Sequence, residues 1–207
     1  MAYIGLKYFA FAPITAETEG SDPTYGTGSV CGKAIGADVT FTRNDNVLRA
    51  DDGDAEFDNS ITGGTINIEM DDLPVDMRVT MLGGYKDSTT SEYYDTAASG
   101  PYGGFGYIRE VRYNSGSTRF DAYWVYKVAF AQEEDSATTM AESIEWQTPR
   151  LNGRMMGGYF GASSAAGGHV IYRAMKSFDT FAAAKAWVNG KAGITTTTST
   201  TTNTTPS

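Results

Sequence analysis

The densest group of side chains able to do chemistry is a run of five carboxylates at Asp51, Asp52, Asp54, Glu56 and Asp58. Clustered carboxylates can bind calcium or act as a general acid and base. The helix–loop–helix calcium motif needs Gly at its sixth position and Glu at its twelfth, but counting from Asp52 these positions hold Phe57 and Gly63. The spacing favours a solvated or subunit-contacting loop. A small hydrolase is the weaker alternative, because a polar loop rarely fixes acid–base geometry.

Residues for nucleophilic catalysis are few. The chain has one cysteine, Cys31, and one histidine, His169, so one chain can form neither an internal disulfide nor a Cys/His zinc site. No Gly-x-Ser-x-Gly elbow adjoins His169, and Gly103-Gly104-Phe105-Gly106 lacks the features of a phosphate-binding loop. A Cys31–His169 pair remains an alternative to a lone buried cysteine and a loop histidine. We therefore expect a non-enzymatic protein without cofactor or metal.

Composition and charge narrow the class of protein further. The 207 residues are 41% hydrophobic and include 13 Tyr, 10 Phe and 3 Trp, enough for one domain with a sizeable core. A formal charge of −9 disfavours nucleic-acid binding, which depends on Lys and Arg at phosphates. The N-terminal residues lack a basic segment followed by an apolar one, and no apolar run of about 20 residues occurs. We expect synthesis in the cytoplasm and no membrane span.

Alternation of apolar and polar residues predicts the strands. It predicts strands at 37–41, 65–70 and 107–113. A further strand is expected at 4–11, ended by Pro13, and the apolar and aromatic run 120–130 pairs with 107–113 in a long hairpin. Shorter strands are expected at 144–148 and 170–175. In the hairpin, alternate positions share one face, and this face includes Tyr107, Arg109, Val111 and Tyr113. Residues 43–64 lack this period and predict a long charged loop.

Two short helices complete the expected fold. The first follows Asp71-Asp72-Leu73-Pro74, where an Asp can cap it, and stops at Gly83-Gly84. The second is capped by Ser177 or Asp179 and ends at Gly190. The packed face of the first helix contains Leu73, Met77 and Met81.

These elements predict a mainly β fold: two packed antiparallel sheets, sandwich-like or barrel-like, with one or two short helices. The domain spans residues 1–192. The Thr-rich segment 193–207 is too polar to form a core of its own and is expected to be a disordered tail.

The order of these features resembles the major tail protein family of non-contractile, long-tailed bacteriophages over about residues 1–190. The hairpin at 107–130 and the helix at 178–188 belong to this resemblance. The short segments that carry the resemblance are Ile4-Gly5-Leu6-Lys7-Tyr8, Leu48-Arg49-Ala50-Asp51-Asp52-Gly53, Ile66-Asn67-Ile68 before Asp71-Asp72-Leu73, and Met81-Leu82-Gly83-Gly84.

The resemblance implies a structural protein of the virion. Six copies would form a ring, and stacked rings would form the hollow tail tube through which DNA passes without specific binding. Partners would be other copies of the chain, the tape-measure protein, and the tail-terminator and distal-tail proteins, with no membrane. Two alternatives remain: a tube subunit of a contractile or secretion apparatus, and a β-sandwich surface-binding module.

The resemblance also suggests where assembly contacts lie. In that family a long early loop bridges one ring to the next, and the matching segment here is 43–64. Mixed charges can fix the register between rings. An acidic lumen would not retain DNA, and strand alternation suggests Glu110 and Asp121 as lumen-facing carboxylates. The expected inter-ring contact residues are Arg43, Asp45, Arg49, Asp51, Asp52, Asp54 and Glu56.

Overall fold

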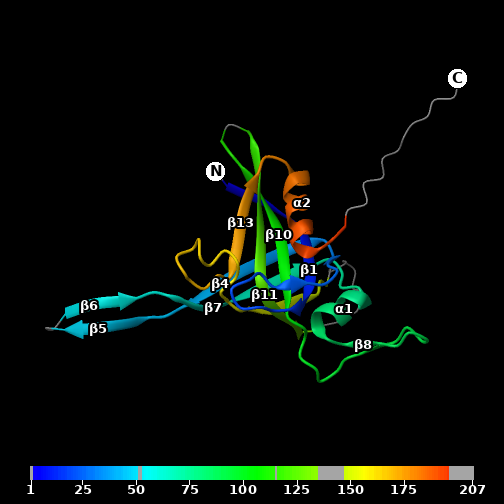
Figure 1. The fold of residues 1–207 in the computed structure, drawn as a ribbon. Coiled ribbons are helices and arrows are strands. Elements are labelled where there is room, and N and C mark those ends of the chain that lie inside the picture. The colour runs from blue at the N-terminus through cyan, green and yellow to red at the C-terminus, as the bar shows by residue number, and fades with distance from the viewer. Residues whose placement is uncertain (1, 51–52, 115, 135–146, 196–207) are drawn as a thin grey trace, which may run out of the picture.

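The structure, a computed structural model, describes residues 2–50, 53–114, 116–134 and 147–195. This part of the chain is mainly β with two helices, as predicted (Figure 1). Its large antiparallel sheet has nine strands. They are β1 (Ala2–Ala16), β2 (Thr24–Tyr25), β3 (Ser29–Val30), β4 (Ala34–Arg43), β7 (Ile61–Met70), β10 (Gly103–Arg112), β11 (Thr118–Glu134), β12 (Arg150–Met155) and β13 (Arg173–Phe178).

The sheet curls back on itself. Its strand order is β2-β1-β10-β11-β12-β7-β4, with β13 also paired to β11 and β3 to β1. Although β10 and β4 are far apart in this order, Nη2 of Arg109 on β10 donates to the carbonyl of Ala37 on β4 at 3.3 Å. The curvature encloses one apolar cluster, to which β1 contributes Phe9 and β7 contributes Ile66.

A second apolar cluster lies on the other face of the sheet, beneath helix α2 (Phe181–Ala192). Alternate residues of β11 serve the two clusters: Tyr123 and Val125 pack in the first, Ala122 and Trp124 in the second. Side chains of β11 therefore alternate between the two faces, and both faces of the central strands are apolar because both are covered.

Residues 43–64 form a projecting β-hairpin, which corrects the predicted loop. Strands β5 (Asn46–Ala50) and β6 (Gly53–Asp58) pair with each other and continue the β4–β7 pair away from the body (Figure 1). We call residues 44–60 the arm. Alternation does not predict the arm because its described apolar side chains, Val47 and Phe57, are not covered by the core.

The first helix, α1 (Val75–Leu82), has the predicted packed face but not the predicted cap. Met77 and Met81 are buried, and the helix ends at Gly83, whose φ is 78°. Its N-cap is Pro74, with no side-chain hydrogen bond. The Asp71 carboxylate instead accepts the backbone N–H of Lys33 at 2.5 Å.

Helix α2 begins and ends later than predicted. Thr180 is the cap: its side chain accepts the N–H of Ala183 at 3.3 Å, and its backbone is extended. Gly190 lies inside the helix, which ends at Gly193 with φ of 64°. An alanine-rich segment continues helically through one glycine at a cost of about 1 kcal/mol.

Two strand predictions also change, and one strand was not predicted. Strand β1 continues through Pro13, whose carbonyl accepts the N–H of Gly26 at 2.8 Å, because a proline can accept even though it cannot donate. Strand β12 was not predicted. The strand expected at 170–175 begins at Arg173, and the one expected at 144–148 lies mostly outside the described residues, as does most of the 193–207 tail.

A second small hairpin projects near α1. It is formed by β8 (Tyr85–Lys86) and β9 (Tyr93–Tyr94). No helix in the described ranges is long and apolar enough to cross a membrane.

Candidate functional site

The residues considered for nucleophilic chemistry do not form a site. Cys31 is buried, and burial raises the pKa of its thiol to about 12, so the thiol stays protonated and unreactive near neutral pH. His169 is exposed in a turn-rich segment. No hydrogen bond joins Cys31 to His169 in the part of the chain that the structure covers.

The carboxylates considered for metal binding lie on the arm. Within the described ranges, no group of three or more His, Cys, Asp or Glu residues could hold a metal ion. Asp51 and Asp52 fall outside these ranges. At the base of the arm, the Asp58 carboxylate accepts Asn44 Nδ2 at 2.7 Å and Ser60 N at 3.0 Å, and hydrogen bonds from both residues lower its pKa.

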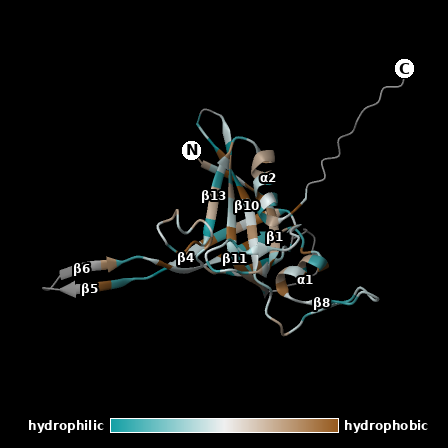
Figure 2. Ribbon diagram, viewed as in Figure 1, coloured by the Kyte–Doolittle hydropathy of each residue, from teal (hydrophilic) through white to brown (hydrophobic). Residues whose placement is uncertain are grey.

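The arm carries an exposed apolar pair. Val47 on β5 lies opposite Phe57 on β6, and their exposed fractions are 41% and 58%. Figure 2 shows apolar positions on these two strands, well away from the core. Exposed apolar groups on a projecting element are typical of a contact site.

The predicted inter-ring residues occupy successive parts of the arm and its base. Nη1 of Arg43 donates to the carbonyl of Asn59 at 3.3 Å, and Asp45 is exposed. Arg49 lies opposite Asp54 in the backbone register. Glu56 lies opposite Leu48, so both pairs of positions belong to the paired strands β5 and β6.

The two predicted lumen carboxylates lie on opposite faces of the sheet. Glu110 pairs with Lys7 at 2.5 Å and lies on the α2 face, where Lys7 also contacts the Phe181 ring. Asp121 lies on the enclosed face, and its side chain is only 1% exposed. The prediction for Asp121 is therefore wrong: a buried carboxylate cannot line a lumen.

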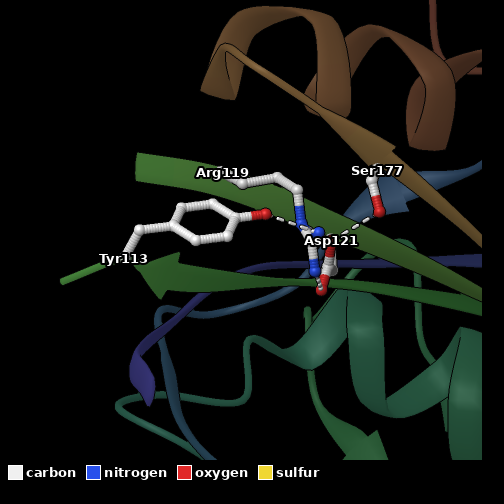
Figure 3. A network of polar contacts seen from close by, with 4 residues as sticks. All are labelled: Tyr113, Arg119, Asp121 and Ser177. Atoms are coloured by element: carbon white, nitrogen blue, oxygen red, sulfur yellow. Dashed lines mark hydrogen bonds and ion pairs between the residues drawn. The ribbon is translucent and has the colours of Figure 1, made fainter. Parts of the chain in front are cut away.

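Asp121 instead organises a polar network (Figure 3). The Arg119 guanidinium donates to both of its oxygens, at 2.9 and 3.1 Å, and Ser177 Oγ donates at 2.7 Å. Nη1 of Arg119 also donates to the Tyr113 hydroxyl at 2.7 Å. The hydrogen bond to Asp121 raises the pKa of Arg119. This network ties β13 and the hairpin turn to β11.

Next to this network, on the enclosed side of the sheet, arginines and tyrosines interleave: Tyr107 and Tyr123 are buried, and Arg109 and Arg173 are partly exposed. Arg109 on β10 lies 5.4 to 5.7 Å from the ring centroids of Tyr3, Tyr107 and Tyr123. Arg173 on β13 lies 4.7 Å from the Tyr123 centroid, and its Nη1 donates to the Tyr107 hydroxyl at 2.8 Å. We define the arginine–tyrosine face as Tyr3, Tyr107, Arg109, Tyr123, Arg173 and Met175.

Part of the arginine–tyrosine face could be found in the sequence. Alternation already placed Tyr107 and Arg109 on one side of a strand. Arg173 and Met175 joined them only when β13 paired with β11, and Tyr3 only when β1 paired with β10. The sequence alone does not predict this face, because these pairings connect segments that are distant in the chain.

No protein-family model matches the chain, and no curated protein matches it.

Proposed function

We propose that this chain is a non-enzymatic structural protein of a virion, the subunit of the tail tube of a long-tailed, non-contractile phage. In this proposal it forms hexameric rings that stack into a hollow tube for DNA delivery. The ring number and the neighbouring tape-measure, tail-terminator and distal-tail proteins come from the resemblance to the major tail protein family.

The observation that carries the proposal is the arm. A two-stranded hairpin that projects from its own domain buries little apolar surface and is marginal in isolation. Val47 and Phe57 remain exposed on it, so a partner that covers them would stabilise the arm. An element of this form suits a contact between copies.

Open sheet edges support ring formation. Among the described strands, β4 pairs only with β7, and β13 only with β11. Each therefore has an edge that another chain can extend, and a closed ring of copies removes such edges. A ring whose two faces bind each other gives an open stack, which is the symmetry of a tube.

The acidic composition is compatible with a DNA conduit. A net charge of −9 makes the surface negative on average. Such a surface repels the phosphates of DNA, so DNA would pass without being held.

A shortened arm tests the assignment. The N–H of Asn44 donates to the carbonyl of Ser60 at 2.7 Å, so a tight turn can replace residues 45–58 between them. We expect the variant to retain its far-UV circular dichroism and lose stacked tubes in negative-stain images. The control shortens the β8–β9 hairpin by replacing residues 87–92. Tubes that persist without the arm would show that the arm does not stack rings.

A second function has one observation in its favour. Tyr85 and Tyr94 of the β8–β9 hairpin are 55% and 48% exposed, and their rings stack with centroids 6.2 Å apart. Exposed tyrosine pairs are common on binding surfaces, which would suit a surface-binding module. Such a module would work as a monomer, whereas the tube subunit must assemble.

A further inference from the structure

We propose that helix α2 acts as a latch for the N-terminal half of β1. Through Asn189 the helix holds Tyr8 in a strained bulge, and this bulge keeps residues 2–7 paired with β10. The two elements come from opposite ends of the chain and pack against each other (Figure 1). These contacts lie within one chain and do not depend on the proposed tube assembly.

Strand β1 carries one extra residue at Tyr8. Lys7 lies opposite Ile108 on β10, and Phe9 lies opposite Tyr107, so Tyr8 has no opposite residue in the register. An extra residue on one strand of an antiparallel pair is a β-bulge, which bends the strand and redirects its side chains.

The bulge decides which side chains of the N-terminal segment face the core. Leu6 and Phe9 both pack in the enclosed apolar cluster although they are three residues apart, which a regular strand would not allow. Without the extra residue, Lys7 would lie opposite Arg109 on the enclosed side and lose its ion pair with Glu110. Like charges opposite each other are destabilising, so loss of the bulge should detach residues 2–7 instead of shifting their register.

The backbone of the bulge is strained. Tyr8 has a φ of 62°, in the left-handed region that residues with a Cβ adopt only at a cost in free energy. Among the described residues other than glycine, only Tyr8 and Ser91 have a positive φ, and Ser91 lies in the turn between β8 and β9. A strained conformation persists where surrounding contacts hold it. Contacts of the Tyr8 side chain must therefore compensate for the strain.

Three residues of α2 at four-residue spacing contact the Tyr8 side chain. The Tyr8 hydroxyl donates a hydrogen bond to Oδ1 of Asn189. The Phe181 ring meets the Tyr8 ring edge to face, with centroids 6.5 Å apart, and Nζ of Lys185 lies 5.0 Å from the Tyr8 centroid. Residues four apart share one side of a helix, so α2 reaches Tyr8 with one continuous face.

Asn189 makes the contact selective for the bulge. It is only 3% exposed, beside the alanine and valine residues with which α2 packs on the sheet. A buried amide oxygen without a donor costs free energy, so the hydrogen bond from Tyr8 matters. In a regular strand Tyr8 would take the present place of Lys7 opposite Ile108, a shift of about 3 Å along the strand that breaks this hydrogen bond. Docked α2 therefore favours the bulge.

Removal of the hydrogen bond is the first test. The full-length variants Asn189→Leu and Tyr8→Phe each delete it, one from the helix and one from the strand. Hydrogen exchange followed by mass spectrometry compares the amides of residues 3–7 with those of residues 9–12. We expect exchange at 3–7 to become at least about tenfold faster in both variants, and exchange at 9–12 to change by less than about threefold, because Phe9 and Phe11 stay buried in the core.

The matched control removes a different tyrosine hydroxyl from the same side of the sheet. Tyr25 packs in the apolar cluster beneath α2, and its hydroxyl donates to the carbonyl of Tyr126 at 2.8 Å. Tyr25→Phe should leave exchange at 3–7 within about threefold of the wild type. Circular dichroism checks that all variants are folded, and Tyr8→Phe keeps α2 intact if Asn189→Leu does not fold.

Relief of the strain is the second test. Glycine adopts a left-handed φ without the penalty of a Cβ, so a glycine at position 8 should keep the bulge without help from Asn189. We expect the double variant Tyr8→Gly/Asn189→Leu to bring exchange at 3–7 back to within about threefold of the wild type.

Fast exchange at 3–7 in the single variants, with recovery in the double variant, would support the latch. Unchanged exchange at 3–7 in the single variants would overturn it. Equal acceleration at 3–7 and 9–12, or an equal effect of Tyr25→Phe, would also overturn it, because α2 would then act only as a general cover. A double variant that exchanges as fast as Asn189→Leu would overturn it as well, since strain at Tyr8 would not be what the helix compensates.

Discussion

The role of Asp121 in the structure differs from the role expected from its position in the sequence. In the sequence it is an acid within an alternating strand, which suggested exposure to solvent. In the structure Ser177, from a strand more than 50 residues later, covers it and donates a hydrogen bond. Alternation predicts which face a residue is on, but it cannot predict which later strand covers that face.

The Asp121 network predicts a loss of stability on truncation. Asp121→Ala removes three hydrogen bonds and leaves a cavity beside Ser177, so we expect the free energy of unfolding to fall by about 1–3 kcal/mol. Urea denaturation followed by tryptophan fluorescence measures the change. Asp38→Ala, at an exposed position of β4, should change it by less than about 0.5 kcal/mol. Equal effects of the two substitutions would contradict the structural role of the network.

At the scale of elements, glycine positions distinguish tight packing from open space. A Cβ on Gly106 would lie 2.5 Å from a Val188 methyl group and 2.9 Å from the Trp124 ring, beneath α2. At Gly190, inside α2, nothing lies within 4 Å of the added carbon. The same substitution should therefore have opposite effects at these two sites.

We expect Gly106→Ala to lower the free energy of unfolding by about 1–3 kcal/mol, because α2 must move away from the sheet. Gly190→Ala should raise it by about 0.5–1 kcal/mol, since alanine favours the helix. Thermal denaturation of the two variants measures both changes. A stabilising Gly106→Ala would show that α2 does not pack where the structure puts it.

Strands can be predicted from the sequence where one of their faces is buried, because burial makes apolar and polar residues alternate. Strand β7 has Ile66, Ile68 and Met70 on its buried side, as expected from the sequence. On the arm, by contrast, the described apolar side chains Val47 and Phe57 are exposed, so burial imposes no such pattern on them. Strand β12 contains Gly153, where a Cβ would lie 2.6 Å from the Phe130 ring; close packing there selects glycine and obscures the strand pattern.

At the scale of the whole molecule, the predicted mainly β class is confirmed, but the two predicted packed sheets are one curled nine-stranded sheet with an apolar cluster on each face. Curling brings β4 close to β10, which closes the core around Phe9 and Ile66 and leaves strand edges and the arm outside. The outcome is a domain whose own core is complete while its edges and projecting hairpin remain available to other chains.

The central claim is that this chain assembles with itself. Negative-stain electron microscopy of the purified, full-length protein at rising concentration is the most direct test. We predict rings or hollow tubes that become more numerous as concentration increases, because edge pairing and arm docking are both contacts between copies. A particle that remains a monomer up to its solubility limit would contradict the claim.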